Sequence, residues 1–242
     1  MKANAVLRYG LGTVLLLGGC TGGSHYKAKG DMKKLMTGKR VAILAFDGTT
    51  VLTGEGNLAS LAARSAAAKG TEGSAVLDQG FIDWSYDLYV NAFKGEGYQV
   101  IPTDEVLKSP SYRSASTLAL PTTLPARGLR PVNMKKESVT AIAKDLKADY
   151  VIRIMNGHHL FNKTGHLPFV GRMLGKNVGQ AMIDMSVFDP AGERILWVNA
   201  AEISDQGALQ VGGVQDPKKA IPMFKDANQK LASKVAAELA KK

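Results

Sequence analysis

The run Lys-Arg-Val-Ala-Ile-Leu-Ala-Phe-Asp at residues 39–47 is the feature that most constrains the fold. It is almost continuously apolar and closes at Gly48. Its length and its β-branched residues favour a strand that is buried on both faces, the type found in sheets of parallel strands. Such a strand needs packing partners on both sides, so we expect an α/β domain to form around it.

The segments that follow alternate between helical and strand patterns. The Asp-Pro-Ala-Gly turn at 189–192 joins the last two strands into an antiparallel hairpin. Helices between the earlier strands act as crossovers and imply parallel neighbours. The predicted fold class is α/β, a single mixed sheet of parallel strands plus an antiparallel C-terminal hairpin, flanked by helices. The further strands are expected at 98–102, 150–155, 181–187 and 195–203, and the helices at 81–94, 103–108, 135–146 and from 216 onward.

Three long inserts interrupt the predicted domain of residues 39–242, at 49–77, 109–133 and 156–179. The first is rich in Gly and Ala, with a helix expected over Asn57–Lys69. Four prolines in the second exclude a helix there. If the first three strands are parallel, all three inserts leave from their carboxyl-terminal side, where open α/β sheets bind partners.

Two of these inserts lie in basic stretches of a chain whose formal net charge is +10. Residues 106–136 and 150–183 contain no acidic residue. One reading is solvated loops; the other is a partner-binding face, for which Arg127, Arg130, Phe169 and Arg172 are the candidate residues. Basic surfaces suit anionic envelope partners. Blocks of Lys and Arg with interleaved aromatics are absent, so we expect no nucleic acid to bind.

The sequence offers no convincing cofactor, metal or catalytic site. Residues 54–59 match a loose dinucleotide fingerprint, but the preceding strand ends too early for a tight turn. Residues 171–177 resemble a P-loop that is one residue short. The histidines at 158, 159 and 166 lack neighbouring carboxylates and are expected to form a polar loop. We therefore predict no catalytic residue, no cofactor and no metal.

The segment Val14-Leu15-Leu16-Leu17-Gly18-Gly19-Cys20 follows a basic start and ends at the chain's one cysteine. This pattern is typical of a secretory signal, and its Leu-x-Gly-Cys ending resembles the lipobox of bacterial lipoproteins. The resemblance implies cleavage after residue 19 and acylation of Cys20. Removing 1–19 deletes two basic residues and lowers the charge to +8. Residues 20–38 then form a flexible tether rich in Gly, Ser and Lys. Thr21 stands where an inner-membrane retention signal has Asp, which implies the periplasmic face of the outer membrane.

The motifs KRVAILAF, GYQVIPTDEVL, AKDLKADYVIRI and VFDPAGERILW occur in this order before a final amphipathic helix. They resemble the α/β domain of envelope lipoproteins such as CsgG, LpoB and PelC, and the N-terminal domain of TolB. The likeness covers about two thirds of the chain. It implies the same fold, and the ring-forming relatives make a homo-oligomer an option. The inserts lack the long alternation of a membrane-spanning hairpin, which argues against a pore.

The function expected from these features is that of a lipid-anchored, non-enzymatic envelope accessory protein. It would dock on a secretion, cell-wall or polymer-export assembly through an envelope protein partner, with the lipid anchor holding it to the membrane. Two alternatives remain open: a ring subunit of an outer-membrane export channel, and an envelope hydrolase.

Overall fold

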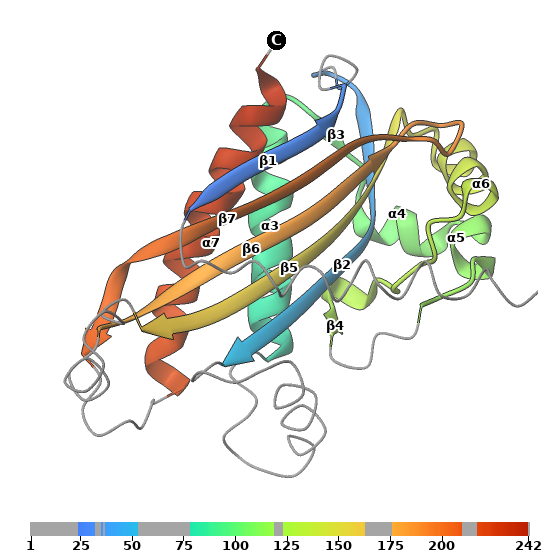
Figure 1. The fold of residues 1–242 in the computed structure, drawn as a ribbon. Helices are drawn as coiled ribbons and strands as arrows, with labels where there is room; N and C mark the ends of the chain where they lie inside the picture. The colour runs from blue at the N-terminus through green and yellow to red at the C-terminus, as the bar shows by residue number, and fades with distance from the viewer. Residues whose placement is uncertain are drawn as a thin grey trace, which may run out of the picture.

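The computed structural model describes residues 24–31, 35, 37–52, 78–118, 123–162, 176–209 and 217–241. Their strands form one seven-stranded sheet in the order β1-β7-β6-β5-β2-β3, and β4 pairs with β2 off this path (Figure 1). The strands are β1 (His25–Gly30), β2 (Arg40–Leu52), β3 (Gln99–Val100), β4 (Leu124–Pro125), β5 (Tyr150–Asn162), β6 (Lys176–Phe188) and β7 (Arg194–Leu209).

The strand directions confirm the predicted fold class. Strand β2 runs parallel to β3 and to β5, while β6 is antiparallel to β5 and to β7, and β1 is antiparallel to β7. The apolar run that opened the sequence analysis lies in β2, and residues 41–48 are buried. A β-bulge between Ile43 and Ala45 interrupts its register with β5.

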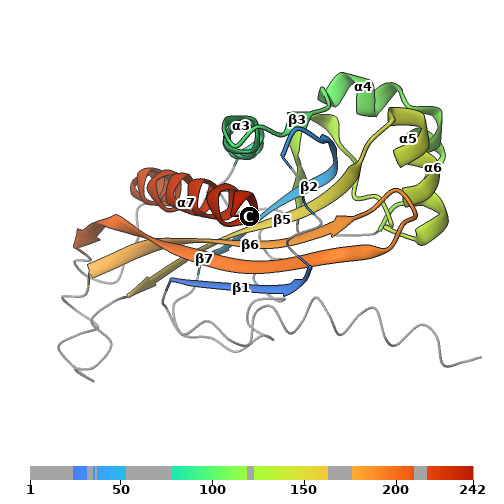
Figure 2. The same ribbon diagram turned by 90° about the horizontal axis from the view of Figure 1, so that it is seen from above.

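Helices α3 and α7 lie along one face of the sheet, and α4, α5 and α6 gather beyond the end at which β2 starts (Figures 1 and 2). The main core fills the space between the sheet and α3 and α7, where Phe46 of β2 packs against Tyr86 and Tyr89 of α3. None of the described helices is long and apolar enough to cross a membrane. The helices are α3 (Gln79–Gly95), α4 (Thr103–Lys108), α5 (Pro110–Ser114), α6 (Lys136–Leu146) and α7 (Pro217–Ala240), with a short 3-10 turn, η2 (Ala126–Gly128).

Strand β1 replaces part of the flexible tether predicted for residues 20–38. It pairs antiparallel with β7, from His25 opposite Ala201 to Gly30 opposite Leu196. Tyr26 packs against the core, and His25 Nε2 lies 2.8 Å from Asn199 Oδ1. Lysines suit an edge strand because they discourage pairing with other chains. That polar composition made the segment read as a tether.

Helix and strand also extend further into the described ends of the inserts than predicted. Helix α5 contradicts the exclusion of helix from 109–133, because Pro110 occupies the first helical turn, where its missing N–H is not needed. Ser109 Oγ caps this helix by accepting from Tyr112 N at 3.2 Å. Strands β5 and β6 extend into the predicted insert 156–179 as far as Asn162 and Lys176. The helix expected over Asn57–Lys69 lies outside the described residues.

Candidate functional site

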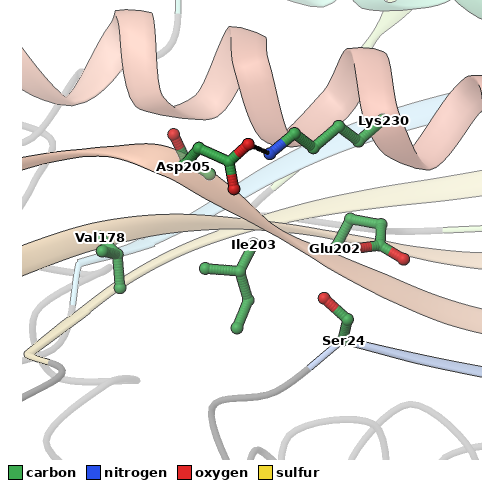
Figure 3. Close-up of a pocket in the computed structure, with 7 residues that line it drawn as sticks. Ser24, Val178, Glu202, Ile203, Asp205 and Lys230 are labelled. Atoms are coloured by element: carbon green, nitrogen blue, oxygen red, sulfur yellow. Dashed lines mark ion pairs between the residues drawn. The ribbon is translucent and has the colours of Figure 1, made fainter.

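A polar notch opens at the sheet edge where β1 begins and β7 continues beyond it. Its volume is about 350 Å³. Strand β7 pairs with β1 only as far as Ala201, so the second half of β7 borders the notch. Figure 3 shows side chains from β7 and α7 meeting there. The lining residues are Ser24, Val178, Glu202, Ile203, Ser204, Asp205 and Lys230.

The charged side chains that line this notch have ion-pair partners, Glu202 with Lys234 and Asp205 with Lys230. Lys230 of α7 forms ion pairs with Asp205 and, at 3.6 Å, with Asp226. The hydrogen bond to Asp205 raises the pKa of Lys230. Burial opposes ionisation of Asp226, but hydrogen bonds from Ser204 Oγ (2.8 Å) and Asp205 N (2.7 Å) and the charge of Lys230 outweigh it and lower its pKa. The notch therefore presents paired, hydrogen-bonded charges and no group poised as a base.

A second polar cluster is fully buried between the sheet and the two long helices. Asn228 of α7 is its centre: Nδ2 lies 2.9 Å from Ser85 Oγ on α3, 3.2 Å from Asn156 Oδ1 and 3.1 Å from His158 Nε2 on β5. Asn156 returns a hydrogen bond from Nδ2 to Asn228 Oδ1 at 3.1 Å. All four residues are buried. Hydrogen-bonded buried amides of this kind fix the relative placement of the elements that carry them.

His158 belongs to this cluster and not to the polar loop predicted for it. Its ring packs against Phe81 and Phe224, with centroids 5.0 and 5.5 Å away. Burial lowers the pKa of His158 to about 4, although its hydrogen bond to the Thr49 carbonyl favours the charged form. The imidazole is therefore neutral at pH 7. Both of its nitrogens have partners within the chain, at Thr49 O and Asn228 Nδ2, so neither is free to bind a metal.

Asp47 is a buried carboxylate on the opposite face of β2 from Phe46. Among the described residues, neither of its oxygens has a hydrogen-bond partner. It stands beside Met155 of β5 and Pro125 of β4 in the strand register. Burial raises its pKa to about 6, and the positive charge of Arg153 offsets part of this rise. The Asp47 carboxylate is therefore shielded from solvent and has no hydrogen bond to a described residue.

The structure gives both described arginine candidates partners inside the chain. Arg127 forms a two-point ion pair with Asp87 of α3, and its backbone N–H donates to Asp83 Oδ1 at 2.7 Å. The guanidinium of Arg130 donates to the carbonyls of Arg113 (2.7 Å) and Ala115 (2.9 Å) at the end of α5. Arg130 thereby satisfies carbonyls that a helix end leaves open. Their partner-binding role stays a prediction. Phe169, Arg172 and Cys20 lie outside the described residues.

Sequence reasoning missed the notch and the Asn228 cluster. Asn228 did leave a signal, since it lies four residues after Phe224 and three before Leu231 on the apolar stripe of α7. A polar side chain at that position in a helix is buried and needs partners. The notch left no such signal, because it lies where β1 begins beside β7, and β1 was not predicted.

The structure defines the class of the molecule as a mixed α/β sheet with two long helices on one face. No protein-family model matches the sequence, and no curated protein matches it. The chain is similar to a PelC dodecamer from Paraburkholderia phytofirmans, with 10% identity, coverage of 90% of this chain and 99% of PelC, and a TM-score of 0.33.

Two further solved structures are similar to this chain. The C-terminal domain of LpoB from Salmonella enterica has 13% identity, coverage of 71% and 85%, and a TM-score of 0.29. A protein named as a homologue of the neuraminyllactose-binding hemagglutinin, from Helicobacter pylori, has 12% identity, coverage of 90% of each chain and a TM-score of 0.41. PelC and LpoB are two of the proteins that the sequence motifs resemble. With TM-scores below 0.5, these likenesses carry no residue role to this chain.

Proposed function

We propose that the protein is a lipid-anchored accessory module of the bacterial envelope, on the periplasmic face of the outer membrane, and that it acts by docking and not by catalysis. The observation that carries the proposal is the apolar run that ends at Cys20. Acyl chains on this cysteine would hold the domain at the membrane, since each buried CH₂ contributes about 0.8 kcal/mol. A single sheet with helices on one face is a suitable scaffold for presenting a binding surface.

The proposed docking face is formed by the basic inserts. Strand β4, in the second insert, pairs with β2 at Asp47 and Gly48, and β2 ends at Leu52 beside Leu160 of β5. The described ends of the first and third inserts lie toward the end of β2 at Leu52, whereas the second insert runs from α5, beyond the other end of the sheet, to β4 beside Asp47 and Gly48 (Figure 1). Arg113 of α5 is exposed at this insert. The partner expected there is an acidic surface of a secretion, cell-wall or polymer-export protein.

Acylation is tested first, by mass spectrometry of the N-terminal peptide of protein purified from membranes. We expect a peptide that starts at Cys20 and carries acyl chains. Cys20→Ser should abolish acylation and release the protein from membranes, whereas Ser24→Ala should change neither. An unmodified wild-type N-terminus, or a start elsewhere, would refute the anchor.

Docking is tested by affinity capture from cross-linked membranes. The informative variant is the double substitution Arg127→Asp with Asp87→Arg, which swaps the two charged residues. It keeps an ion pair at this place but removes the arginine from position 127, where the partner would contact it. Arg172→Glu probes the third insert, and Lys144→Glu on the exposed side of α6 is the matched control. Loss of one captured envelope protein in the first two variants, but not in the control, supports the proposal. Capture of the chain alone as a ring favours the channel subunit, and a monomer with hydrolytic turnover favours the enzyme.

A further inference from the structure

Strand β1 shortens the connection between the proposed anchor and the folded domain. Only residues 21–24 separate Cys20 from His25, the first residue paired with β7. An extended chain spans at most about 3.6 Å per residue, so the α-carbon of Cys20 lies within roughly 18 Å of that of His25. A tether that reached residue 38 would extend over roughly 60 Å.

This short connection determines which part of the domain lies at the membrane. The sheet places β1 at one edge and β3 at the other, five strand spacings or roughly 24 Å away. Helices α4, α5 and α6 lie beyond the end of the sheet at which β2 starts (Figures 1 and 2). A chain anchored at Cys20 cannot place those helices on the bilayer with the start of β1 more than about 18 Å above it.

The edge that this geometry places at the membrane carries two exposed lysines. Lys27 and Lys29 are exposed on β1, and no described carboxylate forms an ion pair with either. Lys29 Nζ lies 5.9 Å from the centroid of the Trp197 ring. Of the nearby acids, Asp184 is in register with Lys27 two strands away and accepts a hydrogen bond from Trp197 Nε1 at 2.8 Å, and Asp31 follows β1 directly.

We infer that the β1 edge rests on the bilayer surface and that Lys27 and Lys29 contact the headgroups of anionic phospholipids. This inference rests on the proposed acylation of Cys20. A basic residue near an anionic membrane surface contributes about 1 kcal/mol, and this attraction falls off within a Debye length. The short connection lets both lysines come inside that range when β1 lies along the bilayer, and the acyl anchor and the lysines then act together to orient the domain.

The test uses the full acylated protein in vesicles that carry a nitroxide on their headgroups. Because Cys20 is the one cysteine and its sulfur is acylated, an introduced cysteine is the single free thiol for a fluorophore. Ala28→Cys reports on β1, and Ser114→Cys reports on α5; both residues are exposed. We expect much stronger quenching at position 28 than at 114. Equal quenching, with acylation verified by mass, overturns the orientation and leaves the anchor intact.

The charge contact has its own readout. Lys27→Gln with Lys29→Gln, in the Ala28→Cys protein, should lower the ratio of membrane-apposed to free domain by roughly 30-fold in vesicles containing phosphatidylglycerol. The same pair of changes should have little effect when phosphatidylglycerol is replaced by phosphatidylcholine. Lys94→Gln with Lys144→Gln is the matched control on α3 and α6. Quenching that ignores both the lysines and the lipid charge refutes the headgroup contact.

Discussion

Replacing Asp47 by Asn should make the protein more stable at neutral pH. The carboxylate is fully buried, and neither oxygen has a hydrogen-bond partner among the described residues. Burial raises its pKa from 3.8 to about 6, in spite of the attraction of Arg153. The folded state must therefore hold a charge that its surroundings disfavour. Asparagine has nearly the same shape and cannot ionise.

The expected gain follows from the difference in pKa between the folded and unfolded states. Each unit of pKa corresponds to about 1.4 kcal/mol, so a rise of about two units destabilises the ionised native state by about 3 kcal/mol. Because the folded pKa is the higher one, the penalty is absent below pH 3.8, grows as the pH rises toward 6, and is complete above it. The Asn variant should equal the wild type near pH 4 and exceed it by about 3 kcal/mol at pH 7 to 8.

Urea unfolding followed by circular dichroism at a series of pH values measures this difference. At pH 7.5 the midpoint for Asp47→Asn should lie about 1 M or more above that of the wild type. Glu105→Gln removes an exposed carboxylate from α4 and should shift stability by less than about 0.5 kcal/mol at every pH. A stability difference for Asp47→Asn that does not change between pH 4 and 7.5 would refute the reasoning, as would a variant less stable at neutral pH.

Three further outcomes follow from the packing. Asn228→Ala should lower the free energy of unfolding by about 3 to 5 kcal/mol in urea, because it leaves several buried polar groups without partners; Gln229→Ala, one residue along on the exposed side of α7, should change it by under about 0.5 kcal/mol. Gly30→Ala should increase hydrogen exchange across β1, because Gly30 has a φ of +124° and an added Cβ would lie 2.2 Å from the Ile195 carbonyl oxygen. In the control Gly95→Ala the added Cβ meets nothing within 4 Å, so β1 should stay protected. Arg130→Ala should lower the free energy of unfolding by about 1 to 3 kcal/mol, and with it the thermal midpoint, because it removes the hydrogen bonds to the end of α5. An unchanged midpoint would show that these bonds do not contribute to stability.

The elements predicted best from the sequence are those whose own residues show a continuous or periodic apolar pattern. Strand β2 and helix α3 have continuous or periodic apolar positions. Helix α4 was predicted to end at Lys108 with Thr103 as its cap, and in the structure Thr103 is its first residue. Edge strand β1 was missed because a strand with one paired side needs little apolar content. Helix α5 was missed because the four prolines of the insert were expected to exclude a helix. Pro110 stands at the first helical position, where proline is tolerated.

The candidate site was harder to predict, because its groups meet only in three dimensions. Asn228 and Ser85 are separated by 143 residues, and Asn228 and Asn156 by 72. No local pattern relates such positions. His158 was read as one of three loop histidines because β5 was expected to end at Met155, three residues before it. The predicted end of β5 at Met155 thus put the His158 imidazole in a loop, whereas the longer strand of the structure places it in the core.

The pairing of β1 with β7 also determines the order in which the domain can be completed. His25 and Asn199 are 174 residues apart, so β1 has no partner until nearly the whole chain has been synthesised. Closing so long a loop is entropically costly and slow. Strand β1, the strand closest to Cys20 in the sequence, can therefore pair only after residues 196–201 are available. Under the proposed acylation of Cys20, the processing enzymes would act on the chain before β1 is paired, and the pairing of β1 with β7 would follow.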